Sequence, residues 1–197
     1  IKGLGEKFTE KVKVIPPGPE DSWFDVDRSK AFSNQILFWG RIEEEKGLPE
    51  LFLALKTVAK KINDVKLILV GEGNRLQEYK SRVANLNLTD HVEFTGWKTS
   101  AEIQNICSES SLAVFPSRIE SFGLSVIEAM ASTIPVVASR GGAIPENIVD
   151  GVTGKLVPVK NSDALAEAII SVLEDPSSAE KMAKSARSAI QQKFSWE

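Results

Sequence analysis

Short apolar runs alternate with longer amphipathic stretches along most of the chain. The apolar runs predict buried strands at residues 36–39, 66–70, 92–95, 112–115, 136–138 and 155–157, with a further short candidate at 12–15. Helical spacing between the runs predicts helices at 48–62, 75–86, 123–131, 162–173 and 177–193, and one that Ser100 opens. This alternation favours an α/β fold in which a doubly wound, Rossmann-like parallel sheet has about six strands.

The stretch 112–139 combines a strand, a loop, a helix and a second strand. Pro116 ends the first strand, and Pro135 separates the helix from the second strand. Helical spacing places Leu124, Ile127 and Met130 on one face of the helix, which we expect to be buried. The stretch therefore presents the N-terminus of a helix close to the end of a strand.

Two carboxylates flank the junction of this loop and helix, because Glu120 precedes the helix and Glu128 lies within it. Between them are the unpaired N–H groups of the first helical turn, at Ser121, Phe122, Gly123 and Leu124. These donors and the partial positive charge of the helix end suit a phosphate, and carboxylates accept hydrogen bonds from sugar hydroxyls. In the alternative interpretation, Glu120 only caps the helix and Glu128 is a solvated surface residue.

A second candidate loop follows the strand at residues 36–39. Gly40 and Arg41 begin it, and Lys46 comes just before the next helix. Loops at the carboxyl ends of parallel strands form the ligand crevice of α/β sheets, and Arg and Lys can neutralise a diphosphate there. We expect the three glutamates at 43–45 to point to solvent. The alternative is that both bases are solvated too.

Two further loops carry weaker signals. Gly71 and Gly73 follow the strand at 66–70, and a lone pair of glycines there can be merely a tight turn. Trp97 and Lys98 follow the strand at 92–95, where Trp97 could equally be a packing residue.

Composition excludes several classes of function. The 197 residues include 24 basic and 27 acidic ones, for a formal net charge of −3, and no basic cluster suggests nucleic-acid binding. Cys107 is the only cysteine and His91 the only histidine, so neither a zinc cluster nor an intrachain disulfide is predicted. A buried structural thiol and a loop histidine are the expected roles of these two residues.

The sequence from Glu120 to Ala131, with two glutamates eight positions apart, resembles the signature of the GT-B-fold retaining glycosyltransferases called group 1 or family 4. The resemblance covers roughly residues 12–197 and implies the C-terminal, donor-binding half of a GT-B fold. On this interpretation residues 1–197 form one nucleotide-sugar-binding domain with a lead-in at 1–11. The N-terminal acceptor domain of the family is absent from this chain.

The resemblance also implies roles for the residues at matching positions. Arg41 and Lys46, in the pattern Gly-Arg-x4-Lys-Gly, would clamp the diphosphate. Glu120 would hold hydroxyls of the donor sugar, and these three residues would be the catalytic ones. Glu128 would hold the ribose diol. The remaining donor contacts implied are Gly40, Gly71, Trp97 and Lys98, the last two beside the base, and the first-turn residues Ser121, Phe122, Gly123 and Leu124.

The reaction implied is transfer of a hexosyl group, with retention, from a nucleotide diphosphate sugar to a hydroxyl of a glycan, lipid or small molecule. UDP is the expected nucleotide and glucose a weaker expectation for the sugar. No cofactor or metal is expected, since the cations would replace a metal. A cytoplasmic location is expected, with contact to the cytoplasmic membrane face through the missing domain. Without that domain the chain should transfer little or no sugar. Two alternatives stay open: a nucleotide-sugar epimerase of the same fold, and a non-catalytic nucleotide-sugar-binding module.

Overall fold

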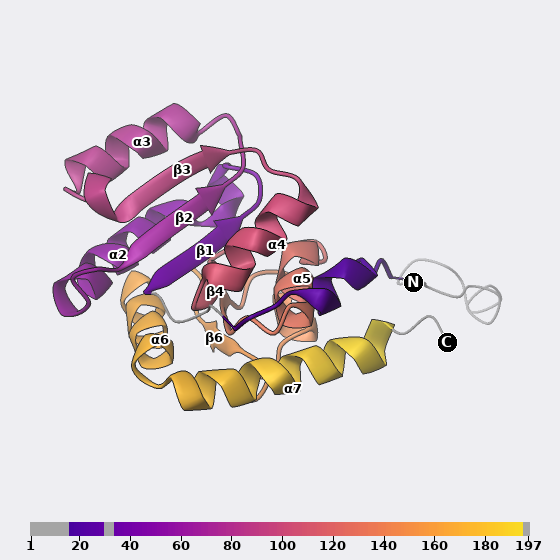
Figure 1. The fold of residues 1–197 in the computed structure, drawn as a ribbon. Coiled ribbons are helices and arrows are strands. Elements are labelled where there is room, and N and C mark those ends of the chain that lie inside the picture. Colours follow the sequence, from indigo (N-terminus) through magenta and orange to yellow (C-terminus); the bar gives the residue numbers. More distant parts are fainter. Residues whose placement is uncertain (1–15, 30–33, 195–197) are drawn as a thin grey trace, which may run out of the picture.

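The computed structural model describes residues 16–29 and 34–194, and its centre is a parallel sheet (Figure 1). Within the described residues the sheet has six strands in the order β3-β2-β1-β4-β5-β6. The strands are β1 (Gln35–Trp39), β2 (Lys66–Val70), β3 (Val92–Gly96), β4 (Leu112–Phe115), β5 (Val136–Ser139) and β6 (Lys155–Val157). The predicted Rossmann-like α/β fold is confirmed.

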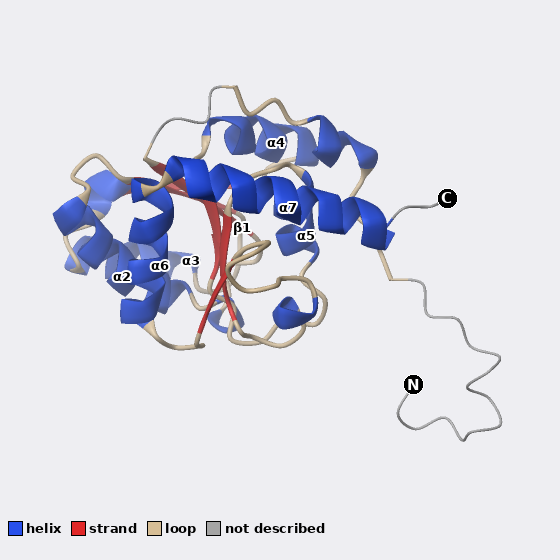
Figure 2. Cartoon of the chain, turned by 90° about the horizontal axis from the view of Figure 1, so that it is seen from below, coloured by secondary structure: helices blue, strands red, loops and turns tan. Residues whose placement is uncertain are grey.

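Helices cover both faces of the sheet. They are α2 (Leu48–Lys61), α3 (Leu76–Asn85), α4 (Ser100–Glu109), α5 (Leu124–Ala131), α6 (Ser162–Glu174) and α7 (Pro176–Phe194). Figure 2 shows the sheet almost edge-on, with α2, α3 and α6 on one side and α4 and α5 on the other. Helix α7 packs against both α5 and α6. Short 3-10 helices are η1 (Asp21–Asp25), η2 (Glu44–Lys46), η3 (Thr89–His91) and η4 (Ile144–Glu146).

The core explains why the strand sequences are almost continuously apolar. All four residues of β4 and all four of β5 are buried, because helices exclude water from both faces. Cys107 is fully buried, and its backbone carbonyl accepts a hydrogen bond from the Arg28 side chain. Its expected structural role is consistent with this position. His91 lies in η3 and its Nδ1 is 2.9 Å from the carbonyl oxygen of Val65.

The predicted face of helix α5 is buried except at its first residue. It begins at Leu124, after Gly123 in the left-handed conformation at φ 85°. Ile127 and Met130 are buried as expected, but 42% of Leu124 is exposed. The exposure of Leu124 fits its predicted place in the first turn at the ligand edge, where it lines a cavity.

Smaller differences concern element ends. Helix α7 begins at Pro176, which is tolerated in a first turn because its missing N–H would be unpaired there. Thr99, rather than Ser100, caps α4, and its hydroxyl and Glu102 complete a capping box. The strand expected at 12–15 lies outside the described residues.

The strand order places a topological switch between β1 and β4. The chain runs from β1 outward to β2 and β3, and then returns to add β4, β5 and β6 on the other side. Since β1 and β4 are parallel neighbours, the loops that follow them emerge at the same edge. Ligands of open α/β sheets bind in the crevice at this point. Arg41 and Gly123, which follow β1 and β4, therefore lie at one edge of the sheet.

The described part of the chain contains no helix that is both long enough and apolar enough to cross a bilayer.

Candidate functional site

The loops that follow β1 and β4 are packed directly against each other. The backbone N–H of Arg118 donates to the carbonyl of Glu45 at 2.7 Å. Gly47 has a φ of 67°, and a Cβ there would collide with the carbonyl oxygen of Pro116. The absence of a side chain at Gly47 thus permits the close approach of the two loops.

Lys46 and Glu120 face each other across these loops. Lys46 Nζ lies 2.7 Å from Glu120 Oε2, and the two side chains are only 15% and 20% exposed. The Ser117 hydroxyl is 3.4 Å from the same oxygen. A largely desolvated ammonium and carboxylate are thereby held at one point, with the β1–α2 loop supplying the cation and the β4–α5 loop the anion.

This ion pair forms part of the wall of a cavity of about 110 Å³ at the carboxyl edge of the sheet. The first turn of α5 contributes to the same wall, so the N-terminus of this helix lies at the cavity that Lys46 also lines. The lining residues are Phe38, Trp39, Lys46, Phe115, Ser117, Glu120, Gly123, Leu124, Ser125 and Val126. The structure thus brings four predicted site residues, Lys46, Glu120, Gly123 and Leu124, into one cavity.

Glu128 lies one helical turn beyond Leu124 and is half-buried. Its Oε2 accepts a hydrogen bond of 3.0 Å from Nε1 of Trp39, at the end of β1. Burial raises the pKa of Glu128 to about 7, and the hydrogen bond from Trp39 acts in the opposite direction. A freely solvated surface glutamate, which was the alternative interpretation, does not fit this environment.

Arg41 is at the expected edge but is turned toward its own loop. Its side chain is 68% exposed and pairs with Glu43 at 3.0 Å and Glu45 at 3.3 Å. Glu44 pairs with Arg75 and Arg118. The expectation that the three glutamates point to solvent holds for Glu44, which is 62% exposed, whereas Glu43 and Glu45 are partly covered. Sequence reasoning did not foresee that arginines supply partners for all three.

The loops at the ends of β2 and β3 lie farther along the same edge. The Gly40 N–H donates to the carbonyl of Val70, and the Gly71 N–H donates to the carbonyl of Gly96. Backbone hydrogen bonds therefore connect these turns to one another. Trp97 is 68% exposed, and Lys98 pairs with Glu102 at 3.4 Å. Trp97 is therefore not the packing residue of the alternative interpretation, and neither Trp97 nor Lys98 lines the cavity beside Lys46.

A second layer of loop supports the segment between Glu120 and α5. The Ala143 N–H donates to the carbonyl of Glu120 at 2.8 Å, and the Asn147 side chain donates to the carbonyl of Phe122 at 3.0 Å. The Phe122 ring packs edge-on against Phe194 of α7, whereas Ser121 is exposed. Residues 141–147 thus fix the backbone of the loop that carries Glu120.

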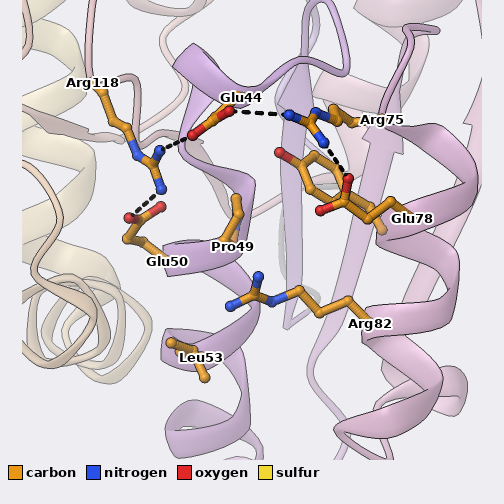
Figure 3. A pocket seen from close by; sticks show the side chains of 9 residues that line it. Glu44, Pro49, Glu50, Leu53, Arg75, Glu78, Arg82 and Arg118 are labelled. Carbon is orange, nitrogen blue, oxygen red and sulfur yellow. Dashed lines mark hydrogen bonds and ion pairs between the residues drawn. The ribbon is translucent and has the colours of Figure 1, made fainter.

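Behind the loops, a chain of ion pairs joins three of the segments at this edge (Figure 3). Arg118 lies between Glu44 at 3.1 Å and Glu50 at 2.7 Å. Glu44 also pairs with Arg75 at 3.2 Å, and Arg75 pairs with Glu78 at 2.6 Å. The chain borders a cavity of about 290 Å³ between α2 and α3. It connects the β1–α2 loop, α3 and the β4–α5 loop, and its residues do not line the cavity beside Lys46.

Sequence reasoning missed several residues of this region. Trp39, Ser117 and Ser125 line the cavity, and Arg118 anchors the chain of ion pairs. Trp39 was recoverable in principle, since it is the last strand residue before Gly40 at the predicted ligand edge. The partners of Arg118 were not, because Glu44 and Glu50 meet it only through the packing of separate loops.

Among residues 16–29 and 34–194, no group of three or more His, Cys, Asp or Glu side chains is arranged to hold a metal ion. The expectation of a metal-independent reaction stays a prediction.

Comparison with known proteins gives this geometry a context. Residues 20–189 match the family described as glycosyl transferases group 1. A glycogen synthase from Mycobacterium tuberculosis is 29% identical over 174 residues, which are 88% of this chain and 42% of that protein. Anabaena Alr3699/HepE, crystallised with UDP and glucose, has a TM-score of 0.82 and 26% identity, over 94% of this chain and 53% of that one.

A third comparison concerns a single domain. The crystal structure of the C-terminal domain of LpcC, a glycosyl transferase group 1 family protein from Francisella tularensis, has a TM-score of 0.76 and 28% identity. The match covers 92% of this chain and 96% of that domain, whereas the chain spans only 42% of the glycogen synthase. The chain therefore belongs to the group 1 glycosyltransferase family and has the size and Rossmann-like fold of a C-terminal domain of its GT-B architecture.

Proposed function

We propose that this chain is the donor-binding domain of a glycosyltransferase that uses a nucleotide diphosphate sugar, with UDP as the nucleotide. The observation that carries the proposal is the Lys46–Glu120 pair at 2.7 Å, beside the N-terminus of α5 and at the switch between β1 and β4. A cation and free amides suit a phosphate, and the carboxylate suits hydroxyls. The UDP named for the Anabaena structure supports the choice of nucleotide.

In the proposed reaction a hexosyl group moves to an acceptor hydroxyl with retention and without a metal. Departure of the nucleotide builds negative charge on the diphosphate, which Lys46 and the first-turn amides of α5 stabilise. Lys46 must turn from Glu120 toward the phosphates for this purpose. Glu120 is then free to accept hydrogen bonds from the sugar, so one exchange of partners prepares both side chains.

Arg41 can join the clamp at low cost. Its partners Glu43 and Glu45 form exposed ion pairs, and such pairs contribute only about 0–1 kcal/mol each. A diphosphate offers more charge at the same distance. We therefore propose that Arg41 leaves its loop partners when the donor binds.

The rest of the donor extends along the carboxyl edge in this proposal. Glu128 holds the ribose, and the base lies toward Gly71, Trp97 and Lys98. Strand β3 is two positions from β1 in the sheet, about 10 Å away at roughly 4.8 Å per strand. The exposed indole of Trp97 offers a flat apolar face to a base at that position.

The cavity beside Lys46 is too small to enclose a whole substrate. Its volume of about 110 Å³ compares with roughly 300–1,000 Å³ for ligand pockets in general. We propose that the acceptor-binding residues and the other wall of the site belong to a second domain. The support for this is that the chain spans only about half the length of the related proteins. The isolated chain should then bind donor nucleotide weakly and transfer little or no sugar.

Calorimetry with UDP and GDP, followed by a transfer assay with UDP-glucose, tests this proposal. We expect UDP to bind more tightly than GDP, with a dissociation constant in the high micromolar range or weaker, and no product. Efficient sugar transfer by the 197-residue chain alone would refute the division of labour. The absence of binding by any nucleoside diphosphate would refute the assignment of the site.

A further inference from the structure

Trp39 is held rigidly at the point where β1 reaches the ligand edge. Its ring stacks on that of Trp23, with centroids 5.7 Å apart and planes 6° from parallel. The Phe115 ring meets it edge-on at 4.9 Å. Only 5% of Trp39 is exposed, and it lines the cavity that contains Lys46 and Glu120. An indole packed on two sides in this way has one orientation for its N–H group.

That N–H group points to Glu128. Nε1 donates to Oε2 at 3.0 Å, and no second hydrogen-bond partner of this carboxylate is found among the described residues. Glu20 is the charged group whose field reaches Glu128, and it disfavours ionisation, as burial does. The Cys107 thiol nearby has a pKa raised to about 11 by burial and is neutral at physiological pH. Trp39 is therefore the neighbour that favours the ionised carboxylate.

We propose that Trp39 is a positioning residue for the nucleotide ribose, which fixes the Glu128 carboxylate so that its second oxygen receives the vicinal diol. The inference rests on the proposed function of the site and adds a residue to it. Oε2 is occupied by the indole, so Oε1 is the oxygen that remains for the hydroxyls. An ionised carboxylate accepts from both hydroxyls, and its orientation decides whether the two bonds can form together. Trp39 thus contributes to selection of ribose over deoxyribose.

The chain supplies a matched control in the other half of the stack. The Trp23 ring is as deeply buried as that of Trp39, but its Nε1 has no hydrogen-bond partner among the described residues. Trp23→Phe and Trp39→Phe each replace one ring of the same pair. Only Trp39→Phe removes the donor to Glu128.

The experiment measures binding of UDP and 2′-deoxy-UDP to the 197-residue chain by calorimetry between pH 6 and pH 8.5. For Trp39→Phe we expect UDP to bind about tenfold more weakly at pH 7, with most of the preference for UDP over 2′-deoxy-UDP lost. Without the donor, Glu128 ionises at higher pH, so the pH at which UDP binding is half-maximal should rise. Trp23→Phe should keep the preference and the pH profile of the unaltered chain.

Equal preferences and pH profiles in the two variants would overturn the role of Trp39 and leave the proposed function standing. Failure of the unaltered chain to bind UDP at any pH would overturn the proposed function instead. Should Trp39→Phe not fold, the indole N–H signal of Trp39 in the unaltered chain provides the test by nuclear magnetic resonance. It should shift as Glu128 titrates and on addition of UDP, and an unchanged signal in both titrations would overturn the inference.

Discussion

Lys46 is a partly buried cation that lines the cavity at the carboxyl edge of the sheet. It is 15% exposed, so its ammonium is only partly hydrated and its interaction with an anion is weakly screened. Glu120 pairs with this ammonium at 2.7 Å, and in the proposed mechanism a diphosphate replaces Glu120. The contribution of Lys46 to the free energy of ligand binding is therefore the difference between its interaction with the diphosphate and its interaction with Glu120.

Replacement of Lys46 by alanine should weaken UDP binding at least tenfold, or about 1.4 kcal/mol. The reason is loss of the cation that lines the same cavity as the N-terminus of α5. Lys60→Ala is the matched control, because Lys60 lies exposed on α2, away from the carboxyl edge. Calorimetry of both variants checks the prediction. Similar losses for the two lysines would show that UDP responds to general positive charge and not to a clamp.

Glu128 links the site to stability. Its pKa of about 7 lies above the ordinary value of about 4.3, so between these values the folded chain holds more protons than the unfolded chain. Stability should therefore fall as pH rises through this window, by an amount on the order of 3 kcal/mol. Glu128→Gln removes the ionisation and should be more stable than the unaltered chain at pH 8, but nearly equal to it at pH 5.

Urea unfolding at the two pH values measures this difference. Glu167→Gln, on the exposed side of α6, is the control and should not alter the pH dependence. If Glu128→Gln showed the same fall in stability between pH 5 and pH 8 as the unaltered chain, another group would be responsible. A gain in stability together with weaker UDP binding would identify Glu128 as a residue kept for function at a structural cost.

At the scale of elements, the site depends on how three loops are tied together. The Lys46–Glu120 pair is one tie, and the proposed mechanism breaks it when the donor binds. Arg118 supplies a second tie through its ion pairs with Glu44 and Glu50 (Figure 3). This second connection does not face the cavity beside Lys46, so it can persist while the first is exchanged.

Arg118→Met should destabilise the chain by about 1–3 kcal/mol, because Glu50 is 14% exposed and would lose its cation. Methionine keeps much of the apolar stem, which limits the loss of packing. Arg82→Met is the control: Arg82 lines the same cavity and makes no ion pair with any described residue. Urea unfolding and UDP binding are the measurements. Equal stability of the two variants would mean that the ion pairs of Arg118 contribute nothing measurable.

The strands were well predicted because burial on both faces leaves an uninterrupted apolar signal. Residues 66–70, 112–115 and 155–157 form strands with the predicted bounds. Local chemistry also marked the ligand edge, since Lys46 and Glu120 both follow strand ends. These features depend only on neighbours in the sequence or on the rule that parallel strands end at one edge.

The remaining details depend on contacts between distant segments. Leu124 has the spacing of a core residue, yet its place in the first turn leaves it at the cavity. Glu44 pairs with Arg75 and Arg118, which are 31 and 74 positions away in the sequence. The hydrogen bond from Trp39 to Glu128 spans 89 positions, and no local pattern could reveal it. The general position of the site was therefore predictable, but the partners of its side chains were not.

At the scale of the whole molecule, the two halves of the sheet come from consecutive halves of the chain. Strands β1 to β3 precede Trp97, and β4 to β6 follow Ser111. Lys46 belongs to the first half and Glu120 to the second, 74 positions later. The candidate site exists only where β1 and β4 pair, so it cannot form within either half by itself.

Because Lys46 and Glu120 lie in different halves of the chain, binding of the nucleotide should report whether the two halves of the sheet have come together. Two peptides that meet between Ser110 and Ser111 would each carry one half of the clamp, and neither should bind UDP alone. Mixed together, they should regain binding as β4 docks on β1. Because UDP would bind only the joined form, mass action requires it to tighten the association of the peptides. A titration of one peptide with the other, with and without UDP, would measure how much the ligand lowers the dissociation constant of the two peptides.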